Sequence, residues 1–340
     1  MAVRRILAIQ LKRLGDLVLA EPALSALRAW GAHVTLVTEA PFDEALAVGA
    51  PRWDELRRHP RGWGASIGFG AALAREGFDV AIDFQGSPTS ARLAWQSGAP
   101  IRVGWRLRGR RLAYTTAVDR NESGPPRHTA DRKLDLVRAI GIPAGDAAPR
   151  LRLTDDDRLT GRRRLIESGG SAGSTPGHDA ILVAIPASRR EYKRWPPESM
   201  ASLLDDFIGA TGAPVVLVGG PGEGNQLTAV QERMSHRPPV ILADGIRTLL
   251  SLLGAARAVV GPDGGARQVA EALAVPTLAL FGPQDPIHWT RLSDRHRAVR
   301  GRRADCSIRC SRGVEPCACL ASTPVPSVLK ELLELWRSAS

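Results

Sequence analysis

Short apolar runs alternate with longer amphipathic stretches along the whole chain. In the first half, uninterrupted apolar runs cover residues 4–11, 32–39 and 78–86. Such runs are typical of strands in a parallel sheet that is covered on both faces. Between the first two runs, apolar side chains recur at helical spacing, and Pro22 suits the first turn of a helix that begins near Glu21.

The second half of the chain repeats this pattern. Its apolar runs cover residues 179–188, 213–220, 239–245, 256–265 and 275–282. Strands that alternate with helix-length stretches build a doubly wound sheet. The predicted fold class is therefore α/β, with two Rossmann-like doubly wound domains that face a central cleft.

The composition between these halves predicts the domain boundaries. Residues 169–178 are rich in glycine and serine and have no hydrophobic period, which indicates a linker. The first domain then covers residues 1–168, and the second covers 179–325. Thr154 is the expected N-cap of the basic helix before the linker. We expect a last helix over 326–340 to pack on one of the domains, with a return to the first as one option.

Composition and charge indicate the class of protein and of partner. The 340 residues are 44% apolar and 24% charged, which is typical of a globular protein. No apolar run approaches the roughly eighteen residues of a membrane span, and the N-terminal run is too interrupted for a signal peptide, so we expect a cytoplasmic protein. The formal net charge of +11 favours polyanionic partners: nucleic acid, phosphorylated small molecules or an anionic membrane face.

The four cysteines lie close together near the C-terminal end. They are Cys306, Cys310, Cys317 and Cys319. Clustered thiolates can bind zinc, but this spacing is not that of a standard zinc ribbon. Free thiols are the alternative in a reducing compartment, and we assign no metal site.

The end of the first predicted strand carries the first candidate chemistry. Ligands of doubly wound folds bind outside the carboxyl ends of the strands, where this chain has Lys12, Arg13, Gly15 and Asp16. Gly15 permits close approach of a ligand, and Asp16 is expected at the mouth of the cleft. The residues alone favour helix capping over catalysis as the role of Asp16, and one side chain can serve both.

Three turns of the second domain are expected at one sheet edge. They carry Ser188, Arg189 and Lys193, then Glu223, and finally Asp263, Gly264 and Gly265. Basic and hydroxyl groups donate to phosphate oxygens, glutamate accepts from ribose hydroxyls, and a helix N-terminus attracts a diphosphate. Together the turns favour a nucleotide-diphosphate site. No P-loop motif is present, and no GxGxxG follows the first strand.

Six segments carry a resemblance to a known family. They are RILAIQLKRLGDLVLAEPALSALR, DVAIDFQGSPTSARLAWQSGAPIRVGW, HTADRKLDLVRAIGIP, PASRREYKRWPPESMASLL, VVLVGGPGE and GPDGGARQVAEALAVPTLALFGPQDPIHW. In this order they resemble the bacterial heptosyltransferases of glycosyltransferase family nine. The resemblance covers nearly the whole chain, and the ordered set is specific although no single segment is.

The resemblance implies a metal-independent, inverting glycosyltransferase of B-type architecture. Such enzymes move a heptose from ADP-heptose to the inner core of lipopolysaccharide, and the donor is a substrate, with no cofactor implied. Asp16 would act as the general base on the acceptor hydroxyl. Lys193, with Ser188 and the helix start at Gly264 and Gly265, would stabilise the departing diphosphate.

The chain departs from the family at its last turn. Many members read D-S/T-G-x-x-H there, whereas this chain reads DGGARQ from Asp263 to Gln268. The lost hydroxyl removes a phosphate donor, and Gln268 cannot carry the charge of an imidazolium. We expect Arg267 to supply that charge, Glu223 to hold the ribose, and Asp263 to order the turn or contact the donor sugar.

Basic residues mark the acceptor side of the first domain. Arg106, Arg108 and Arg110 lie close together, and we assign them with Lys12 and Arg13 to acceptor binding. A basic run is usually a solvated face. The inner core of lipopolysaccharide, however, carries carboxylates and phosphates at a membrane surface, which arginine binds well. The resemblance therefore implies peripheral contact with the anionic inner membrane face.

Other functions stay open at this level. A transferase of the same family could use another nucleotide sugar, and an epimerase of the same architecture would turn over the donor without an acceptor. A degenerate relative would bind nucleotide sugar or glycolipid without transfer, but the retained Asp16 and Lys193 argue against it. Nucleic-acid binding has no helix-turn-helix, finger or RNP-like pattern behind it, so we expect no nucleic-acid partner.

Overall fold

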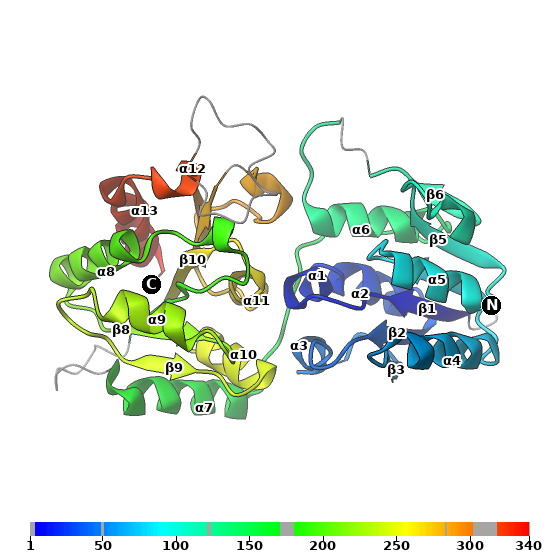
Figure 1. The fold of residues 1–340 in the computed structure, drawn as a ribbon, viewed down its shortest axis with the longest axis horizontal. Coiled ribbons are helices and arrows are strands. Elements are labelled where there is room, and N and C mark those ends of the chain that lie inside the picture. Colours follow the sequence, from blue (N-terminus) through cyan, green and yellow to red (C-terminus); the bar gives the residue numbers. More distant parts are fainter. Residues whose placement is uncertain are drawn as a thin grey trace. The chain divides into compact units, whose positions relative to one another are not determined.

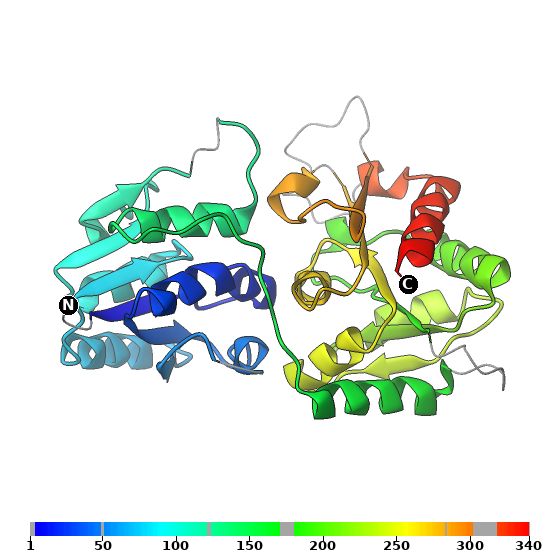
Figure 2. The same ribbon diagram turned by 180° about the vertical axis from the view of Figure 1, so that it is seen from behind.

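The computed structural model describes residues 4–48, 51–120, 124–170, 180–282, 284–301 and 318–339. The chain divides into two compact units, Met1–Arg152 and Leu153–Ser340. Each unit holds one six-stranded parallel sheet with helices on its faces (Figure 1 and Figure 2). Within the described ranges, no helix combines the length and the apolar content that a membrane span needs.

The sheet of the first unit has the spatial order β3-β2-β1-β4-β5-β6. Its strands are β1 (Arg5–Ile9), β2 (His33–Thr38), β3 (Glu55–Arg58), β4 (Val80–Asp83), β5 (Ile101–Trp105) and β6 (Thr116–Val118). Ile9 of β1 lies opposite Val37 of β2 and Asp83 of β4, so these strands end at the same edge. The direction of the connections reverses between β1 and β4, and such a switch point is where doubly wound sheets bind ligands.

Helices cover this sheet in two groups. They are α1 (Leu14–Val18), α2 (Glu21–Ala29), α3 (Glu44–Ala47), α4 (Trp63–Ala74), α5 (Pro88–Gln96), the 3₁₀ turn η1 (Arg111–Ala113) and α6 (Thr129–Arg138). α2 packs against α6, and α4 packs against α5. The predicted helix start at Glu21 is confirmed, with Pro22 in the first turn.

The sheet of the second unit has the spatial order β12-β11-β10-β7-β8-β9. Its strands are β7 (Leu182–Ala184), β8 (Val215–Gly219), β9 (Val240–Leu242), β10 (Ala258–Pro262), β11 (Thr277–Phe281) and β12 (His296–Arg300). Val260 of β10 lies opposite Ala184 of β7 and Leu278 of β11. The switch point of this sheet therefore lies between β7 and β10.

The helical segments of the second unit begin with α7 and end with α13. They are α7 (Asp155–Leu165), η2 (Ile166–Gly170), η3 (Glu191–Lys193), α8 (Pro197–Thr211), α9 (Gly224–Gln231), α10 (Ile246–Gly254), α11 (Gly265–Ala272), η4 (Pro286–His288), α12 (Ala318–Ala321) and α13 (Val325–Ser338). Thr154 caps α7, as predicted, because its side chain accepts from the Asp157 N–H. α13 packs on α8, where the rings of Trp336 and Phe207 meet edge to face with centroids 5.2 Å apart, so this helix belongs to the second unit.

The units divide after Arg152, not at the predicted residue 168. The reason is that α7 packs directly on α10: a Cβ added to Gly161 would lie only 2.0 Å from the carbonyl oxygen of Ser251. Backbone contact of this kind makes α7 part of the second unit. The predicted linker at 169–178 falls almost wholly outside the described residues.

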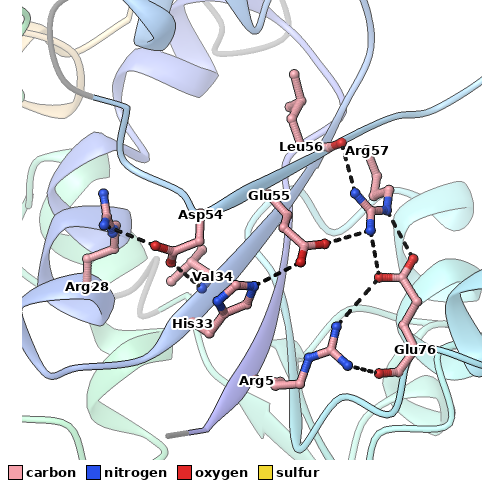
Figure 3. A network of polar contacts seen from close by, with 9 residues as sticks. All are labelled: Arg5, Arg28, His33, Val34, Asp54, Glu55, Leu56, Arg57 and Glu76. Carbon is pink, nitrogen blue, oxygen red and sulfur yellow. Dashed lines mark hydrogen bonds and ion pairs between the residues drawn. The ribbon is translucent and has the colours of Figure 1, made fainter.

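A network of ion pairs fixes the edge strand β3 of the first sheet (Figure 3). Arg57 of β3 donates to the Glu76 carboxylate at 3.1 and 3.2 Å and to Glu55 at 2.6 Å. His33 of β2 contacts Glu55 at 3.1 Å, and this hydrogen bond lowers the pKa of Glu55. These contacts tie β3 to β2 and to the residues after α4, and they secure a short polar strand that pairs on one side only.

We expect Gly161→Ala to destabilise the second unit. The new Cβ would lie 2.0 Å from Ser251 O and 3.1 Å from Leu252 N, both backbone atoms that yield only if α10 moves. Overpacking of this kind costs about 1–3 kcal/mol. Chemical denaturation followed by circular dichroism measures the loss.

Gly209→Ala in α8 is the matched control, because nothing lies within 4 Å of its added Cβ. Alanine is favoured over glycine inside a helix by about 1 kcal/mol, so this variant should equal or exceed the wild type in stability. Equal stability of the two variants would contradict a tight contact between α7 and α10.

Candidate functional site

Glutamine side chains join β1 and β4 at the switch point of the first sheet. Gln85, which follows β4, accepts from the backbone N–H of Lys12 at 2.9 Å. Gln10, which follows β1, donates to the carbonyl oxygen of Lys12 at 2.9 Å. The backbone of Lys12 is thus held on both sides, directly before the helix that carries Asp16.

Asp16 lies in the first turn of α1 and is partly exposed. Its Oδ2 accepts from the backbone N–H of Arg13, the N-cap residue, at 3.3 Å. Asp16 therefore caps the helix from the third position, by reaching back, and not from the N-cap itself. A partly exposed carboxylate at the carboxyl edge of the sheet can also accept a proton.

A buried lysine that the sequence analysis missed lies behind this turn. Lys133 of α6 is 4% exposed and donates to Gln10 Oε1 at 2.5 Å and to Phe84 O at 3.2 Å. Burial lowers the pKa of Lys133 to about 8, although the charges of Asp16 and Asp83 raise it. The signal that could have revealed it is a lysine on the apolar face of an amphipathic helix.

The arginines assigned to the acceptor follow β5. Arg106, Arg108 and Arg110 come directly after this strand, which neighbours β4, so they lie at the same edge of the sheet as Asp16. Arg106 pairs with Asp119 at 2.9 Å, and both side chains are exposed. Exposed ion pairs are weak, so the guanidinium stays available to another anion.

Lys12 and Arg13 occupy the turn between β1 and α1. Both residues are exposed. The ammonium of Lys12 lies 3.5 Å from the Glu39 carboxylate, at the end of β2. The predicted acceptor residues thus gather at the carboxyl ends of β1 and β5.

Lys193 and Asp263 meet across the switch point of the second sheet. Lys193 lies in the loop after β7, Asp263 follows β10, and Nζ lies 2.5 Å from Oδ2. Asp263 is 3% exposed, whereas the Lys193 side chain is 22% exposed. The ring of Trp289 lies 5.9 Å from the ammonium. The buried carboxylate therefore orients a cation that lines a small hollow together with Tyr192 and Gln284.

Ser188 and Glu223 lie at the carboxyl ends of the neighbouring strands β7 and β8. The backbone N–H of Ser188 donates to Gln226 Oε1 at 3.1 Å, and Arg189 is exposed on the same loop. Glu223 Oε2 accepts from the backbone N–H of Gly220 at 2.7 Å. Glu223 thus closes its own glycine turn, a structural role that the sequence did not predict.

Gly264 and Gly265 begin α11 directly after Asp263. The first N–H groups of a helix have no partner within the helix, and they carry the positive end of its dipole. Gln268 lies one turn further along and is buried. The structure therefore brings the predicted ammonium and the predicted helix start together around Asp263.

Arg267 does not supply the charge that we expected at this turn. Its side chain is 1% exposed, and Nη1 lies 2.5 Å from Glu271 Oε2 while Nη2 donates to Trp289 O at 2.7 Å. Glu271 also accepts from the backbone N–H of Arg291 at 2.7 Å. A buried guanidinium needs its counter-charge, so Arg267 is committed to holding the loop at Trp289 against α11.

The cysteine cluster lies mostly outside the described residues. Only Cys319 is described, and its side chain is buried. Among the described residues, no group of three His, Cys, Asp or Glu side chains is placed to hold a metal ion.

Known proteins resemble this chain over most of its length. The family model "Glycosyltransferase family 9 (heptosyltransferase)" matches residues 67–315. Lipopolysaccharide heptosyltransferase 2 of Escherichia coli (strain K12) is 26% identical over 324 residues, which cover 87% of this chain and 88% of that protein.

Solved structures share the fold. The E. coli ADP-heptose lipopolysaccharide heptosyltransferase II is 21% identical with a TM-score of 0.80, covering 98% of this chain and 99% of that one. The E. coli heptosyltransferase WaaC with ADP is 20% identical with a TM-score of 0.69, covering 97% and 99%. The predicted fold class, two doubly wound α/β units of the B-type glycosyltransferases, is confirmed.

We expect Glu271→Gln to destabilise the protein strongly. Burial raises the pKa of Glu271, but the charge of Arg267 and the Arg291 N–H outweigh it and lower the pKa overall. Removing the carboxylate leaves Arg267 buried without a counter-charge, which costs about 3–5 kcal/mol. Thermal unfolding at neutral pH measures the difference.

The Arg267–Glu271 ion pair also makes the stability difference between the wild type and Glu271→Gln depend on pH. Because the pKa of Glu271 is lower in the folded state than in the unfolded state, its contribution is complete above the unfolded value of about 4.3 and is lost as the pH falls through the folded value. Glu198→Gln, which removes an exposed partner of Arg233, is the control and should change little. A difference between wild type and Glu271→Gln that stays constant into acid would contradict the ion pair.

Proposed function

Since the chain belongs to glycosyltransferase family 9, we propose that it transfers a heptose from ADP-heptose to the inner core of lipopolysaccharide. The relatives support this donor and acceptor, since they include a lipopolysaccharide heptosyltransferase and an ADP-heptose heptosyltransferase. The observation that carries the proposal is the position of Lys193, held by Asp263 beside the start of α11. A cation and bare helix N–H groups at one point suit a diphosphate.

Asp16 is the general base in this proposal. Its carboxylate takes the proton of the acceptor hydroxyl while the hydroxyl oxygen attacks the anomeric carbon of the heptose. The bond between that carbon and the diphosphate oxygen breaks, and ADP leaves with the bonding electrons. A single displacement of this kind inverts the configuration at the anomeric carbon.

The second unit binds the donor and stabilises the leaving group. Lys193 and the N–H groups of Gly264 and Gly265 offset the negative charge that develops on the diphosphate, so the step needs no metal ion. Asp263 keeps the ammonium of Lys193 in place. The remaining donor contacts are assigned to Ser188, Arg189, Glu223 and Gln268.

The first unit binds the acceptor. Lys12, Arg13, Arg106, Arg108 and Arg110 follow β1 and β5 at the edge that carries Asp16. Their charges suit the carboxylates and phosphates of the inner core, and they support peripheral binding at the cytoplasmic face of the inner membrane.

We expect Asp16→Asn to lower acceptor-dependent ADP release by about a hundredfold or more, the usual contribution of a general base. Donor binding should persist, because the residues assigned to the donor lie in the other unit. The assay compares ADP release from ADP-heptose with and without a delipidated inner-core acceptor.

Asp206→Asn, the same change on the exposed surface of α8, is the control and should release ADP at the wild-type rate. An equal rate of ADP release with and without the acceptor would contradict transfer. A changed donor sugar without ADP release would indicate an epimerase. Donor binding without any turnover would indicate a non-catalytic binder.

We expect Lys193→Met to weaken ADP binding by about tenfold or more, since a charge-assisted hydrogen bond contributes roughly 1.5–3 kcal/mol. The affinity of the variant should also depend less on salt. Isothermal titration calorimetry with ADP measures both effects, with the exposed Lys330→Met as control. Unchanged ADP affinity would remove Lys193 from the site.

A further inference from the structure

We propose that Lys133 is a positioning residue for the general base, and that it holds the turn of Asp16 through the side chain of Gln10. The inference rests on the proposed function of Asp16. The geometry that points to it is a chain of contacts from a buried helix face to the backbone before α1.

Lys133 connects three elements of the first unit. From α6, its ammonium donates to Gln10 at the end of β1 and to the carbonyl oxygen of Phe84 after β4. Gln10 passes the contact on, because its amide nitrogen donates to the carbonyl oxygen of Lys12. Only one side chain therefore separates the ammonium from the backbone that leads into Asp16.

The ammonium also decides which way the Gln10 amide points. An ammonium can only donate, so it holds the amide oxygen of Gln10 towards itself. The amide nitrogen is then left for the carbonyl oxygen of Lys12. Without Lys133 the amide loses the contact that fixes this orientation, and the Lys12 segment loses one of its two anchors.

The choice of lysine at this position is itself informative. Only four of the 46 basic residues are lysines: Lys12, Lys133, Lys193 and Lys330. A compact ammonium can donate to the two acceptor oxygens, Gln10 Oε1 and Phe84 O, in this buried space. Lys12 and Lys193 also lie at the carboxyl edges of the sheets, so in this chain lysine is concentrated at the proposed site.

The charged groups that face Lys133 are Asp16, Asp83 and Arg120. Burial and Arg120 lower the pKa of Lys133 to about 8 against the two carboxylates, so the ammonium is charged at neutral pH. Asp83 already accepts from the Tyr114 hydroxyl at 2.7 Å. The ammonium of Lys133 therefore adds a positive charge behind the turn that carries the proposed base.

A purely structural role would not require this residue. Both hydrogen-bond partners of Lys133 are neutral, and burying an ammonium against neutral groups disfavours folding. An apolar side chain of similar length removes this cost but leaves Gln10 Oε1 and Phe84 O without their donor, so the two effects on the free energy of unfolding oppose each other. Activity that falls while stability is kept would therefore separate positioning from support of the fold.

The test compares Lys133→Met, Asp16→Asn and the double variant in the ADP-release assay. We expect Lys133→Met to lower kcat by about tenfold to a hundredfold, since small misplacements of a catalytic group have effects of this size. KM for ADP-heptose should stay unchanged, because the donor residues lie in the other unit.

In the double variant, Lys133→Met should add no further loss to Asp16→Asn, because a residue that acts through the base has no effect once the base is gone. Lys330→Met, the same change at an exposed position, should match the wild type. Gln10→Leu removes the side chain that joins Lys133 to the backbone of Lys12, so it should reproduce the loss in kcat. This variant keeps the test decisive if Lys133→Met does not fold.

The outcomes separate this inference from the proposed function. If Asp16→Asn loses its ADP-release activity while Lys133→Met and Gln10→Leu stay fully active, the role of Lys133 alone is overturned. A further full loss of activity when Lys133→Met is added to Asp16→Asn would likewise overturn it. Wild-type activity of Asp16→Asn would overturn the base itself, and the inference with it.

Discussion

In a doubly wound parallel sheet, the direction of the chain connections reverses at a switch point, and a crevice lies there at the carboxyl ends of the strands. In both units a side-chain contact bridges the two strands at this point. The switch point lies between β1 and β4 in the first unit and between β7 and β10 in the second. Gln85 binds the backbone of Lys12 across the first, and Lys193 binds Asp263 across the second. Each proposed catalytic group depends on one of these contacts for its position.

The two contacts differ in charge, and the difference matches the two roles. In the first unit neutral amides hold the backbone, which leaves Asp16 as a partly exposed carboxylate with the ammonium of Lys133 behind it. In the second unit an ion pair fixes Lys193, and the start of α11 adds positive potential. The first edge therefore suits removal of a proton, and the second suits a departing anion.

The sequence predicts a strand best where that strand is buried in the sheet. All eight predicted strands are present, because runs such as 213–220 are apolar on both faces and sit inside a sheet. β3, β5, β6 and β12 were not predicted. β3 reads ELRR and β12 reads HRAVR, and each pairs on one side only, so neither needs an apolar run. β5 reads IRVGW, and the basic run follows it directly in the sequence, so β5 does not stand out as a separate apolar run.

At the site, sequence position predicts best where a strand ends. The turns of Lys193 and Asp263 were predicted at one sheet edge, and the two side chains meet there because both follow strands of one sheet. Arg267 and Lys133 lie on helices, where the 3.6-residue period decides which side chains are buried. Arg267 is turned into the core and pairs with Glu271, which no motif indicates. The role of a charged residue on the buried face of a helix is thus better predicted from the groups that it must contact in the fold than from the sequence motif that contains it.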